Sequence, residues 1–313
     1  MILNLRAGEW VEVRSASEIA ETLDGEAALD RMPFMPEMLQ YCGRRFRVFK
    51  RADKACDTIT GRWVTRRLND SVFLEDMRCD GSVHGGCQAL CSVFWKEAWL
   101  KRVDGPAPAG MAAADVPADI RVRLEYAAGG PPHRETYRCQ ATELVNATTP
   151  LSKWDIRQYL RDIRSGNISV GHFVVWFSVL LFNAVQRRLG GRTYPDVKGR
   201  LVQTPTAALH LRPGEIVRVK PKEEIVKTLD ARSCNRGLSF DVEMVRYCGT
   251  MLRVVARADR IVDEKTGRLI RLPSDCIVLE GATCRGNLST GRIFCQRNIY
   301  AFWREIWLER VDS

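Results

Sequence analysis

Histidine is scarce in this sequence, with only four among 313 residues, and long apolar runs are absent. The longest run, from Phe173 to Val185, is interrupted by Ser178 and Asn183, so we expect no membrane-spanning segment. No Walker A, G-x-G-x-x-G, H-E-x-x-H or G-x-S-x-G pattern occurs, which leaves the common nucleotide, zinc-protease and hydrolase chemistries without support. The first residues lack the pattern of a secretory signal peptide, and the sequence therefore predicts a cytoplasmic protein.

Cysteine, in contrast, is abundant. The chain has 11 cysteines, an odd number, and a hydrophobic content of 45% that is sufficient for two or three domains. Cytoplasmic thiols stay reduced, so this number favours metal ligands or nucleophiles over a disulfide framework. Cys139 could be such a nucleophile, but no base lies near it in sequence.

The chain contains an internal duplication. The segment Trp95–Asp104 recurs as Trp303–Asp312, with seven of ten positions identical, and the opening residues 5–14 recur as 211–220. A repeat of this length predicts one structural unit used twice. We therefore expect three regions, namely a first cysteine repeat at 1–104, a middle region at 105–210 and a second cysteine repeat at 211–313.

Each repeat has the pattern of short strands, such as Phe46–Phe49 and Leu252–Val255, together with one short helix. The helices are expected at Ser17–Leu23 and Lys222–Leu229. The sequence predicts an α+β protein in which two pseudo-symmetric, β-rich repeats, each a small SH3-like barrel, bracket the middle region. The Trp pairs of the duplicated segment are expected in the core, with base stacking as the alternative.

The middle region begins with a Gly/Pro/Ala-rich linker at 105–110. Alternation at 120–126 and 135–144 predicts a β-hairpin, and helical periodicity predicts helices at 153–163 and 170–189. The second helix is apolar nearly all round. This pattern indicates burial between the repeats or docking of a protein partner through residues 173–185, with membrane-surface association as a further alternative.

Aligning the two repeats isolates a set of cysteines that both copies share. Cys42, Cys79 and Cys87 of the first copy correspond to Cys248, Cys284 and Cys295 of the second. A closed tetrahedral site needs a fourth ligand. The candidates for it are Cys276 in the second repeat and Cys56, His84 and Cys91 in the first. The first repeat therefore has surplus ligands, and we expect any catalytic or redox-active centre to lie there.

Zinc and an iron–sulfur cluster both suit sulfur-rich sites, and the spacing Cys79-x₇-Cys87-x₃-Cys91 matches the standard motif of neither. Buried free thiols are the alternative to a metal. The sequence thus predicts a zinc or iron–sulfur centre in each repeat, and it does not decide whether the protein is an enzyme.

The net charge of +10 points to an acidic partner, and basic residues concentrate at 44–67. Arg44, Arg45 and Arg47 are the residues predicted to bind nucleic acid or another polyanion, and a solvated strand face is the alternative. The competing hypotheses are a redox or catalytic metal protein, a metal-stabilised polyanion-binding module and a scaffold for a biosynthetic partner.

The duplicated Tyr-Cys-Gly, Cys-x-Gly and Trp-x-Glu-x-Trp-Leu segments resemble those of an uncharacterised bacterial protein family. The resemblance extends over nearly the whole chain, including Tyr137–Leu144 and Arg157–Arg164. It implies a shared fold and no particular activity.

Overall fold

The structure, a computed structural model, describes residues 3–60, 64–107, 116–129, 136–289 and 292–311. The chain forms two compact units. Unit 1 consists of Met1–Phe173 with Ile261–Ile270 and Gly291–Arg297, and unit 2 consists of Val174–Arg260, Arg271–Thr290 and Asn298–Ser313. Residues 105–210 are divided between these two units, and the division into three regions stays a prediction. Residues 108–110 of the predicted linker lie outside the described residues.

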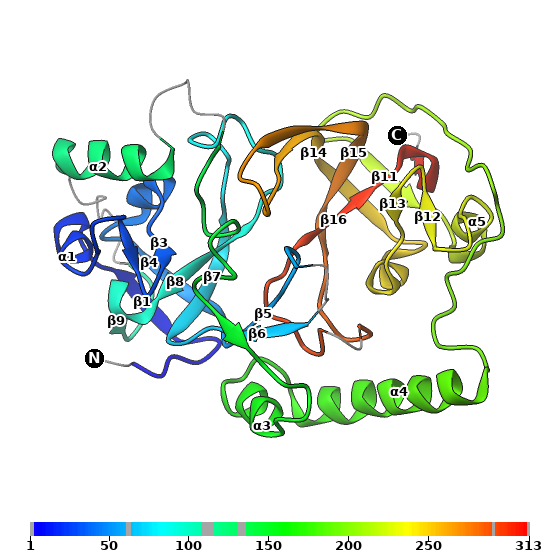
Figure 1. Ribbon diagram of the computed structural model, residues 1–313, viewed down its shortest axis with the longest axis horizontal. Helices are drawn as coiled ribbons and strands as arrows, with labels where there is room; N and C mark the ends of the chain where they lie inside the picture. Colours follow the sequence, from blue (N-terminus) through cyan, green and yellow to red (C-terminus); the bar gives the residue numbers. More distant parts are fainter. Residues whose placement is uncertain (1–2, 61–63, 108–115, 130–135, 290–291, 312–313) are drawn as a thin grey trace. The chain divides into compact units, whose positions relative to one another are not determined.

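The principal sheet of unit 1 has five strands in the order β8-β7-β4-β1-β9 (Figure 1). These strands are β1 (Trp10–Val13), β4 (Arg45–Arg51), β7 (Ser71–Arg78), β8 (Ser92–Lys96) and β9 (Leu100–Val103). Neighbouring strands pair antiparallel, and Val11 stands opposite Phe46. Alternate residues of β1 face the core, as the sequence pattern predicts.

Unit 2 contains a five-stranded sheet of the same order, β16-β15-β14-β11-β17. Its strands are β11 (Ile216–Val219), β14 (Met251–Val262), β15 (Leu269–Thr283), β16 (Tyr300–Trp303) and β17 (Leu308–Arg310). Val217 stands opposite Leu252, the counterpart of the Val11–Phe46 pair. The protein is therefore a strand-rich α+β protein, and the specific SH3-like barrel stays a prediction.

The duplicated Trp residues lie in the core of each unit, as predicted. All four, namely Trp95, Trp99, Trp303 and Trp307, are fully buried. The Trp99 indole N–H donates to Thr22 Oγ1 at 3.1 Å, and the Trp307 indole donates to Thr228 Oγ1 at 3.0 Å. Base stacking, which needs exposed rings, is therefore excluded for these residues in this conformation.

The Glu between the two Trp residues of each repeat binds backbone N–H groups and an Arg side chain within its own unit. It lies in a short 3₁₀ helix, η2 (Glu97–Trp99) or η4 (Glu305–Trp307). The Glu97 carboxylate accepts the backbone N–H groups of residues 3–5 and pairs with Arg51 at 2.5 Å. Glu305 accepts from residues 209 and 211 and pairs with Arg257 at 2.7 Å. The recurring carboxylate thus fixes the segment that precedes the first strand of each sheet.

The short helices of the two repeats are α1 (Ala16–Ala20) and α5 (Lys222–Val226). Both are shorter than predicted, and α1 begins after Ser15 rather than at Ser17. Ser15 and Glu18 form a reciprocal capping box, which satisfies two backbone donors that the helix start leaves open.

The remaining elements are short and connect the larger ones. They are β2 (Ala28–Leu29), β3 (Met32–Pro33), η1 (Pro36–Tyr41), β5 (Lys54–Cys56), β6 (Thr65–Arg67), β10 (Thr149–Pro150), β12 (Cys234–Asn235), β13 (Leu238–Ser239) and η3 (Val242–Tyr247). Within unit 1, η1 places Glu37 of the candidate site.

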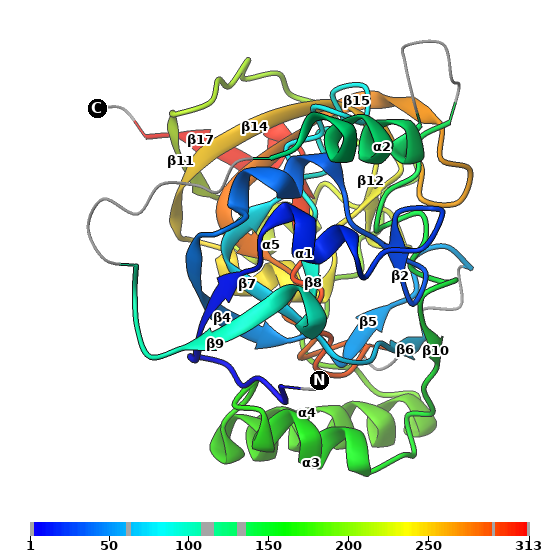
Figure 2. The ribbon, with the colours of Figure 1, turned by 90° about the vertical axis from the view of Figure 1, so that its left-hand side faces the viewer.

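The predicted β-hairpin of the middle region is wrong. Its first half forms helix α2 (Ala118–Ala128), its second half is a series of turns, and the residues between them lie outside the described part of the chain. Leu124 and Ala128, one helical turn apart, are the buried residues of α2, whereas Val122 and Tyr126 are exposed. Packing of this face against α1 and η1 overrides the alternating pattern (Figure 2).

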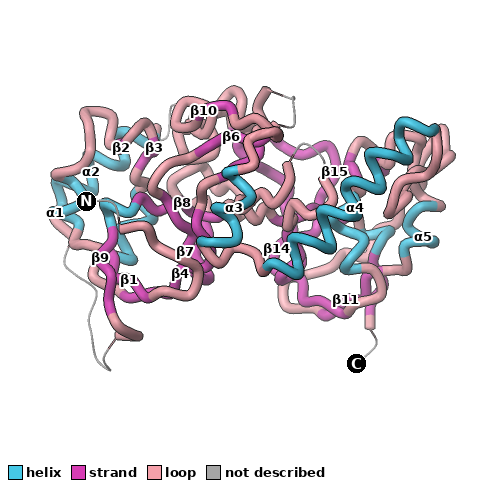
Figure 3. Tube along the Cα trace, turned by 90° about the horizontal axis from the view of Figure 1, so that it is seen from below, coloured by secondary structure: helices cyan, strands magenta, loops and turns pink. Residues whose placement is uncertain are grey.

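The two predicted helices that follow are present as α3 (Arg157–Arg164) and α4 (Val170–Leu189) (Figure 3). Only 11% of the most apolar 18-residue window of α4 is buried, and burial of α4 between the repeats stays a prediction. By length and composition α4 is also apolar enough to cross a membrane. Asn183, one of its two polar interruptions, is buried and bonded to Tyr194.

Candidate metal centre

The candidate centre is built around a compact loop between β7 and β8. Cys79 directly follows β7, and its backbone N–H donates to the Cys91 carbonyl at 2.9 Å. Within the loop, the N–H groups of His84 and Gly86 both donate to the Gly81 carbonyl at 3.0 Å. Gly81 has a φ of +73°, and a Cβ there would lie 1.9 Å from the Cys87 carbonyl oxygen. Only glycine therefore fits at this turn.

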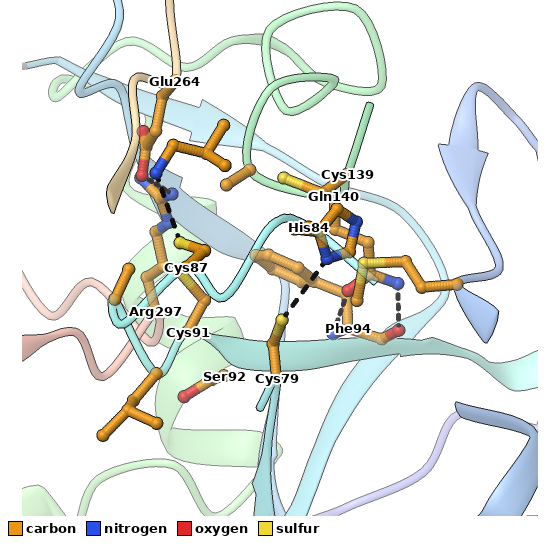
Figure 4. Close-up of a pocket in the computed structure, with 15 residues that line it drawn as sticks. Cys79, His84, Cys87, Cys91, Ser92, Phe94, Cys139, Gln140, Glu264 and Arg297 are labelled. Carbon is orange, nitrogen blue, oxygen red and sulfur yellow. Dashed lines mark hydrogen bonds and ion pairs between the residues drawn. The ribbon is translucent and has the colours of Figure 1, made fainter. Parts of the chain in front are cut away.

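Three potential metal ligands from two elements meet at the base of this loop. Glu37 comes from η1, and Cys79 and His84 come from the loop. The Cys79 thiol donates to Glu37 Oε1 at 3.1 Å. It lies 3.9 Å from His84 Nδ1 (Figure 4). His84 Nδ1 lies 3.6 Å from Glu37 Oε1. One ligand atom from each residue lies within 4.8 Å of the others, so this group could bind a metal.

The group has buried polar atoms that nothing in the described part of the chain satisfies. The side chains of His84 and Glu37 are only 1% and 3% exposed. Glu37 Oε2 and His84 Nε2 are buried and have no hydrogen-bond partner among the described residues. Such atoms are costly to bury and favour a further partner. The atoms nearest the Cys79 thiol, Glu37 Oε1 and His84 Nδ1, are those that could share a cation with it. Burial, reinforced by the Glu37 carboxylate, raises the pKa of Cys79 far above its usual range, so the thiol stays neutral until a positive charge arrives.

A small pocket adjoins the loop, and cysteines are prominent in its lining. Cys79, Cys87, Cys91 and Cys139 all line it, together with His84 (Figure 4). Burial raises the pKa of Cys91 to about 12 and that of Cys139 to about 11, so both are neutral thiols at pH 7. The cavity has a volume of about 40 Å³, which is enough for a water molecule or a ligand of similar size.

An ion pair from the second half of the sequence closes one wall of this pocket. Arg297 pairs with Glu264 at 2.6 Å and donates to Thr58 Oγ1 at 2.6 Å. Glu264 and Arg297 lie in the two C-terminal segments of unit 1, Ile261–Ile270 and Gly291–Arg297. The backbone N–H of Val262 donates to Cys87 Sγ at 3.3 Å. The pocket is thus assembled from segments far apart in the sequence.

Gln140 fixes the segment that carries Cys139. Its side-chain oxygen accepts the Phe94 N–H at 2.7 Å, and its amide nitrogen donates to the carbonyls of Phe94 and Pro33 at 2.9 and 3.0 Å. Gln140 is 3% exposed, so these bonds are shielded from water. Sequence reasoning missed this residue, because a single Gln in a turn-rich segment carries no recognisable pattern.

Replacing Gln140 with Ala should reduce the free energy of unfolding by about 1–3 kcal/mol, because it leaves buried backbone groups without partners. The midpoint and slope of urea unfolding measure this loss. Gln40→Ala is the matched control, since the Gln40 amide only donates locally to the Glu37 carbonyl from an exposed position. Equal losses in the two variants would contradict the role given to Gln140.

The candidate ligands predicted in the first repeat do not all lie at one site. Cys79 and His84 belong to the Glu37 group, and Cys87 and Cys91 line the pocket beside it. Cys42 is fully buried in the core, outside the group, and burial raises its pKa to about 11. Cys56 lies with Cys295, and a hydrogen bond from Cys295, opposed by burial and assisted by Arg297, lowers the pKa of Cys56 to about 6.

The predicted four-thiolate set of the second repeat is divided between the two units. Cys248, Cys276 and Cys284 belong to unit 2, whereas Cys295 belongs to unit 1. Among the described residues, the Glu37 group alone brings three such ligand atoms together. A centre in the second repeat stays a prediction without support from this geometry.

Sequence reasoning also missed Glu37, although a signal for it exists. Glu37-Met38 recurs in the second repeat as Glu243-Met244, at the same place in a 3₁₀ helix. No histidine occurs between Cys284 and Cys295 in the second repeat. There Glu243 Oε1 accepts the Leu288 N–H at 2.5 Å. The second copy thus keeps the Glu and the Cys but lacks the imidazole.

The arginines predicted to bind a polyanion are engaged within unit 1. Arg45 pairs with Glu12 at 3.0 Å, and Arg47 donates to the Gly8 carbonyl at 3.1 Å and lies 4.0 Å from Glu75. Arg44 lies over the rings of Tyr41 and Phe46. Internal carboxylates thus offset part of this charge, and polyanion binding stays a prediction.

The chain matches no protein-family model and no curated protein, so its function is argued from the geometry of the residues described above.

Proposed function

We propose that the protein binds one divalent metal ion in unit 1 through Glu37, Cys79 and His84. The observation that carries this proposal is the convergence of three ligand atoms within 4.8 Å, with Glu37 Oε2 and His84 Nε2 buried and without partners among the described residues. A thiolate, an imidazole and a carboxylate together are a donor set that zinc accepts. Zinc is therefore the proposed metal.

Three protein ligands leave one position of a tetrahedral zinc ion open. Structural zinc sites are closed by four protein ligands, whereas catalytic sites have three and a water molecule. The adjoining cavity of about 40 Å³ can supply that water or a ligand of similar size. The proposed centre is therefore of the open type, in which zinc polarises a bound ligand as a Lewis acid.

A second candidate, an iron–sulfur centre, is favoured by a different observation. Cys79, Cys87, Cys91 and Cys139 line one largely enclosed pocket, and four thiolates are the usual ligands of such clusters. Under this alternative Cys139, which lies outside both repeats, completes the set. Glu37 and His84 would then lie beside the cluster and tune it rather than both bind it.

Purification without added chelator, under anaerobic conditions, should yield a colourless protein with about one zinc ion per chain. The content is measured by inductively coupled plasma mass spectrometry. After removal of zinc, Co²⁺ should bind with the same stoichiometry and give the visible bands of a tetrahedral ion together with a sulfur-to-cobalt charge-transfer band.

A brown protein that contains iron and acid-labile sulfide would favour the second candidate over zinc. A protein that contains no metal, and takes up neither Zn²⁺ nor Co²⁺, would contradict both proposals. Buried free thiols would then be the correct interpretation of the cysteines.

A further inference from the structure

Helix α4 is attached to the protein along one side only. Asn183 donates to the Tyr194 carbonyl at 2.6 Å and accepts the Tyr194 N–H at 2.7 Å. Near the start of the helix, the Phe173 ring lies 6.0 Å from that of Tyr159 and 5.8 Å from that of Phe294. Leu180 and Asn183 are the buried residues of α4. The Asn183 contacts join the helix to the segment that follows it, and the Phe173 contacts lie within unit 1.

The rest of the helix presents an apolar face to solvent. The exposed large side chains are Val170, Val174, Val175, Phe177, Leu181, Phe182, Val185 and Leu189, with exposed fractions from 43% to 76%. Their spacing places them on one broad side of the helix. Ser178 lies among them, and its hydroxyl donates to the Val174 carbonyl at 2.8 Å, so it does not interrupt the apolar character. A contiguous surface of this kind marks an interaction site.

Charge indicates which partner covers this face. Between Asp162 and Asp196 the sequence contains no acidic residue. Arg187 and Arg188 form the last turn of α4, Arg192 follows it, and all three are exposed. A second copy of the chain would bring the same arginines without a carboxylate from this segment to neutralise them. An anionic lipid surface matches both properties, because it takes up apolar side chains and attracts arginine.

We propose that the exposed face of α4 inserts in the plane of an anionic membrane surface and docks the protein there. The apolar side chains enter the boundary between headgroups and acyl chains, and the arginines contact lipid phosphates. The proposal is independent of the metal centre, since none of the candidate ligands lies on α4.

Co-sedimentation with large unilamellar vesicles tests this proposal on the full-length protein. Vesicles of phosphatidylcholine mixed with phosphatidylglycerol should bind the protein at least about tenfold more tightly than phosphatidylcholine alone, since each arginine near an anionic surface adds about fivefold. Added salt should weaken the binding. Phe177→Asp with Leu181→Asp should abolish it, because two carboxylates would enter the apolar boundary.

Val202→Asp is the matched control, because Val202 is 99% exposed and lies outside α4. It should bind vesicles as the unmodified protein does. Should the double variant fail to fold, as judged by circular dichroism, Arg187→Gln with Arg188→Gln should still lose most of the preference for anionic vesicles.

Three results would overturn the proposal. The first is an absence of binding to anionic vesicles, and the second is equal binding by the double variant and the control. The third is self-association in analytical ultracentrifugation that Phe177→Asp with Leu181→Asp removes, without any binding to vesicles. That result would assign the face to a second copy of the chain.

Discussion

Replacing Cys79 with Ser should lower the affinity of the protein for Zn²⁺ by more than about 100-fold, because loss even of a residue that only supports a metal ligand costs 10–100-fold. Cys79 is the one thiol of the Glu37 group, and a serine hydroxyl does not replace a thiolate as a zinc ligand. Competition with a chromophoric chelator measures the change. The affinity of the unmodified protein should also rise with pH, because burial keeps the Cys79 thiol protonated and zinc must displace that proton.

Cys139→Ser is the matched control for this prediction. Cys139 lines the same pocket as Cys79 but lies outside the group of three ligands. The zinc affinity of this variant should stay within a small factor of that of the unmodified protein. Equal losses in both variants would favour the four-thiol cluster over the three-ligand centre, and an unchanged affinity in Cys79→Ser would contradict both.

The two copies of the repeat have diverged at the site rather than in the sheet. Glu243 and Cys284 stand where the first copy has Glu37 and Cys79, but no histidine lies between Cys284 and Cys295. Leu288 supplies a backbone N–H to Glu243, so that carboxylate already has a donor. This difference gives a structural basis for the expectation that function lies in the first repeat.

Much of the fold follows from the duplication in the sequence. Segments with the same apolar and turn positions specify the same local structure, and the two sheets have the same strand order. The buried Trp residues follow for the same reason. Helix α2 could not be predicted from the sequence, because the apolar residues at 120, 122, 124 and 126 alternate as in a strand. Only the packing of Leu124 and Ala128 shows which pattern prevails.

The site was predicted in part. Cys79 and His84 stand out because a loop of cysteines and glycines is a recognisable metal-binding pattern. Glu37 and Cys139 lie on other elements, and only the tertiary fold brings them to the loop or its pocket. Alignment of the repeats pairs Cys295 with Cys87, but it does not show which unit the segment of Cys295 joins. Its segment joins unit 1 through contacts that a linear pattern does not contain.

The segment that carries Cys295 contacts a buried ion pair of unit 1, formed by Lys54 and Asp162. The Lys54 ammonium lies 2.5 Å from Asp162 Oδ2, donates to the Ile293 carbonyl at 3.0 Å, and is 1% exposed, as is the carboxylate. Gln296 donates to the other oxygen of Asp162 at 2.7 Å and accepts the Lys54 backbone N–H at 2.8 Å. The pair therefore joins β5, α3 and residues 293–296 within unit 1.

Asp162→Ala should reduce the free energy of unfolding by about 3–5 kcal/mol, because it leaves the ammonium of Lys54 buried without its counter-charge. Burial lowers the pKa of Lys54, so part of this cost should be relieved by loss of its proton. Urea unfolding measures the loss. Hydrogen exchange should show the largest gain in residues 292–297.

Two further variants separate the buried charge from general damage. Asp155→Ala removes a surface partner of Arg67, both side chains being about 30% exposed, and should change the free energy of unfolding little. Lys54→Met combined with Asp162→Leu removes both charges and should recover most of the stability. Zinc affinity should change little in all three variants, since Glu37, Cys79 and His84 lie on other elements. If the double variant is as unstable as Asp162→Ala, the loss of stability comes from lost packing and not from an unpaired charge, which would contradict this prediction.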